Sequence, residues 1–142
     1  MSQCSPNYQR LLDTPELEGK FELLSSEEAE DCVEWLSNNF SLPYGQIDWS
    51  EYEEAVTEAL PELDYEDLGR RLSGLWLAAD SEVYLVWSDA DEVVAFKWQD
   101  LTDHLEVLWL PGKEDVWLIP ADESGCIELH HEKSLAYLRF DE

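Results

Sequence analysis

At 142 residues the chain has the size of one domain (1–142), and its 34 acidic residues against 8 basic ones give a formal net charge of −26. A surface this negative repels nucleic acid and anionic lipid, which proteins bind through Lys and Arg, and it attracts cationic proteins. Seven Trp, six Tyr and four Phe supply the large apolar side chains that a folded core needs.

In the first half of the chain the apolar residues recur at helical spacing. Ser25 and Glu28 have the spacing of a capping box ahead of a helix that runs to about Asn39. Ser50 and Glu53 have the same spacing and predict a second capped helix. The apolar stripe of this second helix would comprise Tyr52, Ala55, Val56, Ala59 and Leu60.

A short third helix is predicted after Pro61, with Arg70 and Arg71 at its C-terminal end, where the helix dipole favours cations. Its apolar face would hold Tyr65, Leu68 and Leu72.

After Gly74 the chain changes to short runs rich in Val, Leu, Ile and Trp, separated by turn-forming residues. Connections this short require antiparallel neighbours. The predicted strands are 82–87, 93–98, 107–110, 116–120, 126–131 and 135–140, with a helical turn in 98–106. The predicted fold is therefore α+β, with N-terminal helices (1–74) packed on a C-terminal antiparallel meander (75–142) of about five to six strands.

The stretch WSEYEEAVTEALPELDYEDL (49–68) is rich in carboxylates and contains no basic residue. A helix dipole favours acids in a first turn, which accounts for Glu51, Glu53 and Glu54 but not for the later ones. We therefore predict that the stretch binds a basic partner, with aromatic anchors at its two ends. The predicted contact residues are Trp49, Glu51, Glu54, Glu58, Glu62, Asp64, Tyr65, Glu66 and Asp67, and a second-choice patch comprises Asp89, Asp91 and Glu92.

Two tryptophans have two interpretations each. Trp35 lies beside Glu28 and Asp31 at the border of the first predicted stripe, and Trp49 precedes the second predicted helix. Both fit packing at the edge of the core, with Trp49 as a hydrophobic staple. Both also fit an aromatic anchor ringed by carboxylates, which is typical of a binding hot spot.

Neither a metal site nor an enzyme is predicted. Cys126, Glu128 and His130 would share one strand face, but no second ligand cluster accompanies them. His130 and His131 would point to opposite faces, so they are not expected to bind one ion. DADE (89–92) lacks the twelve-residue calcium loop and predicts a hairpin turn. A nucleophile elbow and a phosphate-binding glycine loop are both missing, so no cofactor is expected.

Nothing in the sequence points away from the cytoplasm. The start, MSQCSPNYQR, lacks the apolar region of a secretory signal, and no apolar run reaches the roughly 18 residues of a membrane span. Cys4, Cys32 and Cys126 are odd in number and form no CxxC pair, so reduced thiols are expected.

The runs VYLVWSDADEVV and DVWLIPADESGCIELHHEKSLAYLRF resemble the C-terminal half of small bacterial immunity proteins, which are paired with polymorphic or contact-dependent growth inhibition toxins. The residues that carry the resemblance are Trp87, Asp89, Trp117, Leu118, Ile127, Glu128 and His131. It implies a cytoplasmic inhibitor that binds a cognate toxin domain and blocks its active site. Many such toxins are nucleases, whose substrate groove must be cationic.

Other interpretations stay open at this point. A DNA mimic would carry the same charge but inhibit a DNA-binding protein, and DNA would compete for its target. An acidic protein of a salt-adapted organism would have no charge-directed partner and would be stabilised by molar salt. The free protein is expected as a monomer, or as a dimer paired through a free sheet edge.

Overall fold

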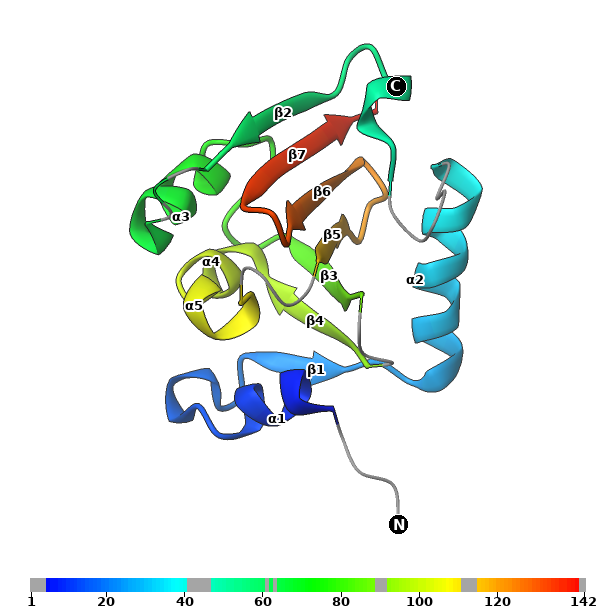
Figure 1. Cartoon of the computed structure of the whole chain (residues 1–142). Helices are drawn as coiled ribbons and strands as arrows, with labels where there is room; N and C mark the ends of the chain where they lie inside the picture. The colour runs from blue at the N-terminus through cyan, green and yellow to red at the C-terminus, as the bar shows by residue number, and fades with distance from the viewer. Residues whose placement is uncertain are drawn as a thin grey trace.

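The computed structural model describes residues 5–40, 47–60, 62, 64–88, 92–110 and 115–140. Within these residues seven strands form one antiparallel sheet, with helices on both faces (Figure 1). The strands are β1 (Phe21–Leu23), β2 (Val56–Ala59), β3 (Glu82–Trp87), β4 (Val93–Lys97), β5 (Val116–Pro120), β6 (Gly125–His130) and β7 (Ser134–Arg139). Their order in the sheet is β1-β4-β3-β5-β6-β7-β2.

The helical elements are α1 (Pro6–Leu12), η1 (Pro15–Leu17), α2 (Ser26–Asn39), η3 (Trp49–Glu51), α3 (Tyr65–Ser73), α4 (Trp98–Thr102) and α5 (Leu105–Leu108). The predicted capping box of α2 is confirmed, because the Ser25 hydroxyl accepts from the Glu28 N–H and the Glu28 carboxylate accepts from the Ser25 N–H. The predicted third helix is confirmed as α3, and the Asp64 side chain caps its N-terminus. None of the described helices is long and apolar enough to span a lipid bilayer.

The α+β class is confirmed, and the sheet has more strands than predicted because the N-terminal half supplies both edges. The short strand β1 pairs with β4, and β2 pairs with β7. The central strands β3 to β7 are those that the β-branched and aromatic runs predict, and β3 and β5 have the predicted bounds.

The helix predicted to begin after Ser50 is wrong. Asp48 caps a single 3-10 turn, η3, and residues 56–59 continue as the edge strand β2. Val56 and Thr57 are β-branched, and pairing with β7 satisfies their backbone groups as a helix would. The predicted strand at 107–110 is also wrong, because Leu105–Leu108 forms α5. A short buried apolar run does not distinguish a strand from a helix.

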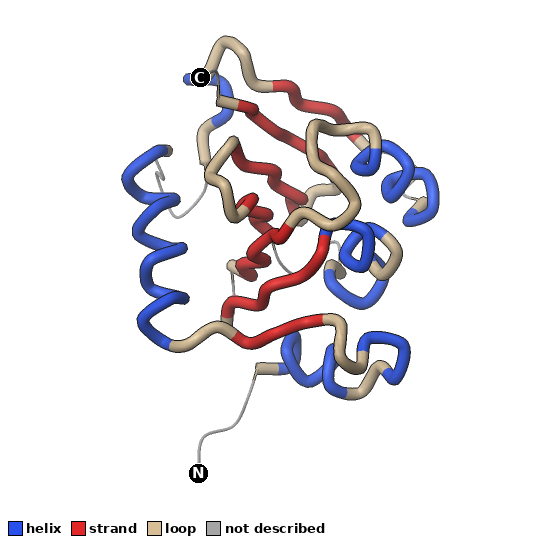
Figure 2. The backbone as a smooth tube through the Cα atoms, turned by 180° about the vertical axis from the view of Figure 1, so that it is seen from behind, coloured by secondary structure: helices blue, strands red, loops and turns tan. Residues whose placement is uncertain are grey.

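The two faces of the sheet carry separate cores. Along β3, Leu85 faces the core shared with α1, α3, α4 and α5, whereas Val86 faces the core shared with α2 and η3. Figure 2 shows from behind that α2 runs along one side of the sheet, opposite the side that carries most of the other helices. Helix α2 reaches that core through Cys32 and Leu36, while its other side chains are exposed or half-buried.

Candidate functional site

The predicted contact segment is partly neutralised within the chain. The Arg71 guanidinium lies 3.3 Å from a Glu58 oxygen and donates to Asp67 at 3.1 Å. Arg70 lies 3.5 Å from Asp67 and 3.7 Å from Glu66. The stretch 49–68 contains no basic residue, but folding places Arg70 and Arg71 beside its acids Glu58, Glu66 and Asp67. These exposed pairs add little to stability, but they reduce the negative potential around α3.

Two other predicted contact residues have structural roles. The Asp64 carboxylate accepts from the backbone N–H of Glu66 at 2.9 Å as the cap of α3. The Tyr65 hydroxyl donates to the carbonyl of Trp109 at 3.0 Å. Glu51, Glu54 and Glu62 are exposed.

The second-choice patch lies in the connection from β3 to β4, which the pairing of Val86 with Val93 shows to be a hairpin. Glu92 accepts from the backbone N–H of Ser5 at 2.8 Å, so it holds the start of the described chain. Asp89 and Asp91 lie outside the residues that the structure describes.

Trp49 is joined to a buried carboxylate. Its indole N–H donates to one oxygen of Glu128 at 3.0 Å, and the indole N–H of Trp117 donates to the other oxygen at 2.8 Å. Trp49 also packs against Phe40 and Tyr52 at the edge of the core. Burial raises the pKa of Glu128, which is 3% exposed, although the two indole hydrogen bonds oppose the shift.

The outer face of α2 is acidic without compensation. The chain contains no Lys, Arg or His between Lys20 and Arg70. In the described part of the chain no ion pair reaches the α2 carboxylates, and all of them are exposed. Glu27, Glu30 and Glu34 lie on the face opposite Cys32 and Leu36, whereas Glu28 and Asp31 lie at the edge of α2 that meets the sheet.

A pocket of about 220 Å³ lies between α2 and the sheet, and it combines aromatic rings with carboxylates. Trp35 and Tyr84 line it together with Glu28, Asp31 and Glu123. The Trp35 indole N–H donates to Glu123 at 3.0 Å. This edge of α2 therefore offers an aromatic surface inside a ring of negative charge, the surroundings that a Lys or Arg side chain favours.

The Cys32 thiol lines this pocket, and its pKa reflects the burial and the negative charge around it. Burial, followed by the charges of Asp31, Glu28 and Glu123, raises the pKa of Cys32 to about 11. Burial likewise raises the pKa of the Cys126 thiol. Both thiols are buried and free of disulfides, so near neutral pH they are protonated and poor nucleophiles.

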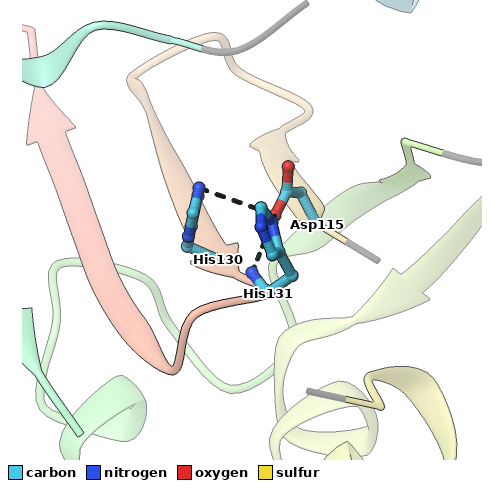
Figure 3. Close-up of side chains that lie close together, drawn as sticks. All are labelled: Asp115, His130 and His131. Atoms are coloured by element: carbon cyan, nitrogen blue, oxygen red, sulfur yellow. Dashed lines mark hydrogen bonds and ion pairs between the residues drawn. The ribbon is translucent and has the colours of Figure 1, made fainter. Parts of the chain in front are cut away.

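Asp115, His130 and His131 come together in one cluster, which the sequence prediction missed (Figure 3). Asp115 directly precedes β5 and His130 ends β6, so the antiparallel register places them opposite each other. His131 begins the turn after β6, where strand alternation stops, and its ring lies 4.2 Å from that of His130. The prediction that the two histidines point to opposite faces is therefore wrong.

Cys126, Glu128 and His130 alternate along β6 as predicted for one strand face, but they do not form a ligand cluster. Cys126 is completely buried, and the two oxygens of Glu128 are bound by indoles.

The sequence matches no protein-family model and no curated protein. The resemblance to immunity proteins therefore depends on the quoted motifs. Of the residues that carry it, Trp87, Trp117, Leu118, Ile127 and Glu128 are buried in the sheet. These residues therefore contribute to packing in the sheet. A binding surface has to consist of exposed residues, and charge indicates which of these are candidates.

Proposed function

We propose that the protein is a cytoplasmic immunity or antitoxin protein, which binds a cognate basic toxin domain and blocks its active site with an acidic surface. The observation that carries the proposal is the outer face of α2, where exposed carboxylates have no ion-pair partner among the described residues. Like charges held close together destabilise a free protein, and a cationic partner relieves that repulsion.

The same side of the sheet carries part of the predicted contact segment. Trp49 and Tyr52 pack in the core that α2 covers, so η3 and α2 lie over one face. Glu51 and Glu54 are exposed there. We place α2, Glu51 and Glu54 at the centre of the interface. The acids of α3 that Arg70 and Arg71 bind, Glu66 and Asp67, belong to the other face of the sheet and fall outside this interface. Glu92 with Asp89 and Asp91 remains the second-choice patch.

A nuclease is the toxin class that this surface fits best. A nuclease binds phosphates through Lys and Arg, so carboxylates on a rigid helix can take the place of the phosphates. The pocket beside Trp35 would receive one cationic side chain, with its stem on Ile119 and its charge near Glu28 and Glu123. Long-range attraction would raise the association rate above the roughly 10⁵–10⁶ M⁻¹s⁻¹ of neutral pairs.

The test begins with capture from a native lysate of the source organism on the immobilised protein, eluted with rising salt. We expect one basic protein retained above about 0.5 M salt, where the Debye length is only about 4 Å. Its nuclease activity should disappear when the immunity protein is added. If DNA competes for a retained protein that has no nuclease activity, the DNA-mimic interpretation replaces this one. A mixture of basic proteins released at moderate salt would remove the support for a specific partner.

Two charge-matched double variants locate the interface. Glu30→Lys with Glu34→Lys changes the exposed face of α2, whereas Glu16→Lys with Glu18→Lys changes exposed acids in and next to η1. Both double variants alter the net charge equally. Loss of binding in the α2 variant alone supports the proposed face. Equal loss in both would show that only total charge matters.

A further inference from the structure

Asp115, His130 and His131 form a cluster of potential metal ligands outside the acidic face (Figure 3). We propose that these three side chains form a binding site for a zinc-class divalent metal ion, with two imidazole nitrogens and one carboxylate oxygen as ligands. Imidazole nitrogen with carboxylate oxygen is a donor set that Zn²⁺ uses when three protein ligands leave one position open.

The separations of the ligand atoms suit one small ion. The Asp115 Oδ1 atom lies 2.8 Å from His131 Nδ1 and 3.9 Å from His130 Nε2. Candidate ligand atoms of all three residues lie within 4.8 Å of one another. Ligands about 2.0–2.1 Å from a tetrahedral ion are about 3.3 Å apart, a value between the two measured separations. Small side-chain rotations therefore bring the three atoms around one ion.

The carboxylate is held in place by the backbone around it. The Asp115 N–H donates to the Ser88 hydroxyl at 2.9 Å, and Asp115 Oδ1 accepts from the His131 N–H at 2.7 Å. The Asp115 side chain is 7% exposed, whereas those of His130 and His131 are 16% and 36% exposed. The site is thus anchored on the buried side by its acid and open to solvent on the side of its imidazoles.

Metal binding requires one change of hydrogen bonding. The Glu132 N–H donates to His130 Nδ1 at 3.1 Å, an arrangement that puts the ring proton on Nε2. Coordination through Nε2 moves that proton to Nδ1 and exchanges the Glu132 bond for one to water. The net value of one hydrogen bond limits this penalty to about 2- to 10-fold in affinity. At His131 the ion takes the position of the proton between Nδ1 and Asp115, and the ring proton moves to Nε2.

Histidine NMR on the unaltered protein tests the site directly, because the chain has only three histidines. Zn²⁺ is added in the presence of a large excess of Mg²⁺, which occupies exposed carboxylates. We expect the ring signals of His130 and His131 to shift up to one equivalent of Zn²⁺. The signals of His104, which lies between α4 and α5 and contacts the Asp100 carbonyl, should stay unchanged. Equal shifts of all three, or none, would overturn the site.

Calorimetric titration with Zn²⁺ under the same conditions compares the Zn²⁺ affinity of the wild type with that of matched variants. His131→Ala should weaken binding at least about 10-fold, the range seen even for outer-sphere changes at metal sites. His104→Ala is the control and should bind like the wild type. His131→Gln, which keeps a donor for Asp115, replaces the alanine variant if circular dichroism shows that the latter is unfolded. A folded His131 variant that binds Zn²⁺ as tightly as the wild type would refute the proposal.

Discussion

Replacing Trp49 by Phe isolates the hydrogen bond between the η3 turn and the sheet. The variant removes the indole N–H that lies 3.0 Å from Glu128, while it leaves an aromatic ring at the position where Trp49 packs against Phe40 and Tyr52. Glu128 is only 3% exposed, so in the wild-type protein its oxygens depend on the two indole donors rather than on solvent. A hydrogen bond to a charged group contributes about 1.5–3 kcal/mol, so we expect the free energy of unfolding to fall by that amount at pH 7.

The sign of the pH dependence follows from the raised pKa of Glu128. Its ordinary value is 4.5, and burial raises it in the folded protein. A carboxyl whose folded pKa is raised contributes its full stability below the unfolded pKa and loses it as the pH rises through the folded pKa. Removing the Trp49 donor raises the folded pKa further. The difference between wild type and variant should therefore grow as the pH rises and shrink as the pH falls toward 4.5.

Urea unfolding followed by far-ultraviolet circular dichroism measures both quantities, at neutral pH and near pH 4.5. Glu128→Gln supplies the control, because in that background no charged acceptor remains for Trp49. There the Trp49→Phe change should have a clearly smaller effect, which a double-mutant cycle quantifies. A Trp49→Phe variant within about 0.5 kcal/mol of the wild type at pH 7 would refute the reasoning, since that is the range of neutral surface substitutions.

Two further predictions concern packing. Gly125→Ala should destabilise the protein by more than about 3 kcal/mol, or prevent folding, because the new Cβ would lie 2.2 Å from the backbone oxygen of Leu138. Gly74→Ala, whose nearest contact would be 3.4 Å, is the matched control and should change stability by less than about 1 kcal/mol. Leu36→Ala removes a side chain that is 2% exposed where α2 meets the sheet, and should cost about 2–5 kcal/mol. Thermal or urea unfolding measures all three, and a Leu36→Ala loss below about 1 kcal/mol would contradict the view that α2 is anchored there.

Local chemistry in the sequence was enough to predict several elements. The pair Ser25 and Glu28 caps α2 through contacts within one helical turn, so no distant residue has to be known. The runs that became β3 and β5 contain β-branched and aromatic residues between turn formers, and their predicted bounds are those observed. Net charge is likewise a property of composition alone.

Pairing between residues far apart in the sequence decided the features that the sequence analysis missed. Residues 56–59 have a helical pattern of apolar side chains, but the free edge of β7 gives their backbone partners that no local pattern reveals. The ion pair between Arg71 and Glu58 joins residues on α3 and β2. The register of β5 on β6 sets Asp115 opposite His130, and the turn after β6 adds His131. Periodicity indicates which face of an element a residue occupies, whereas the neighbour it meets there depends on register and topology, which only the folded chain determines.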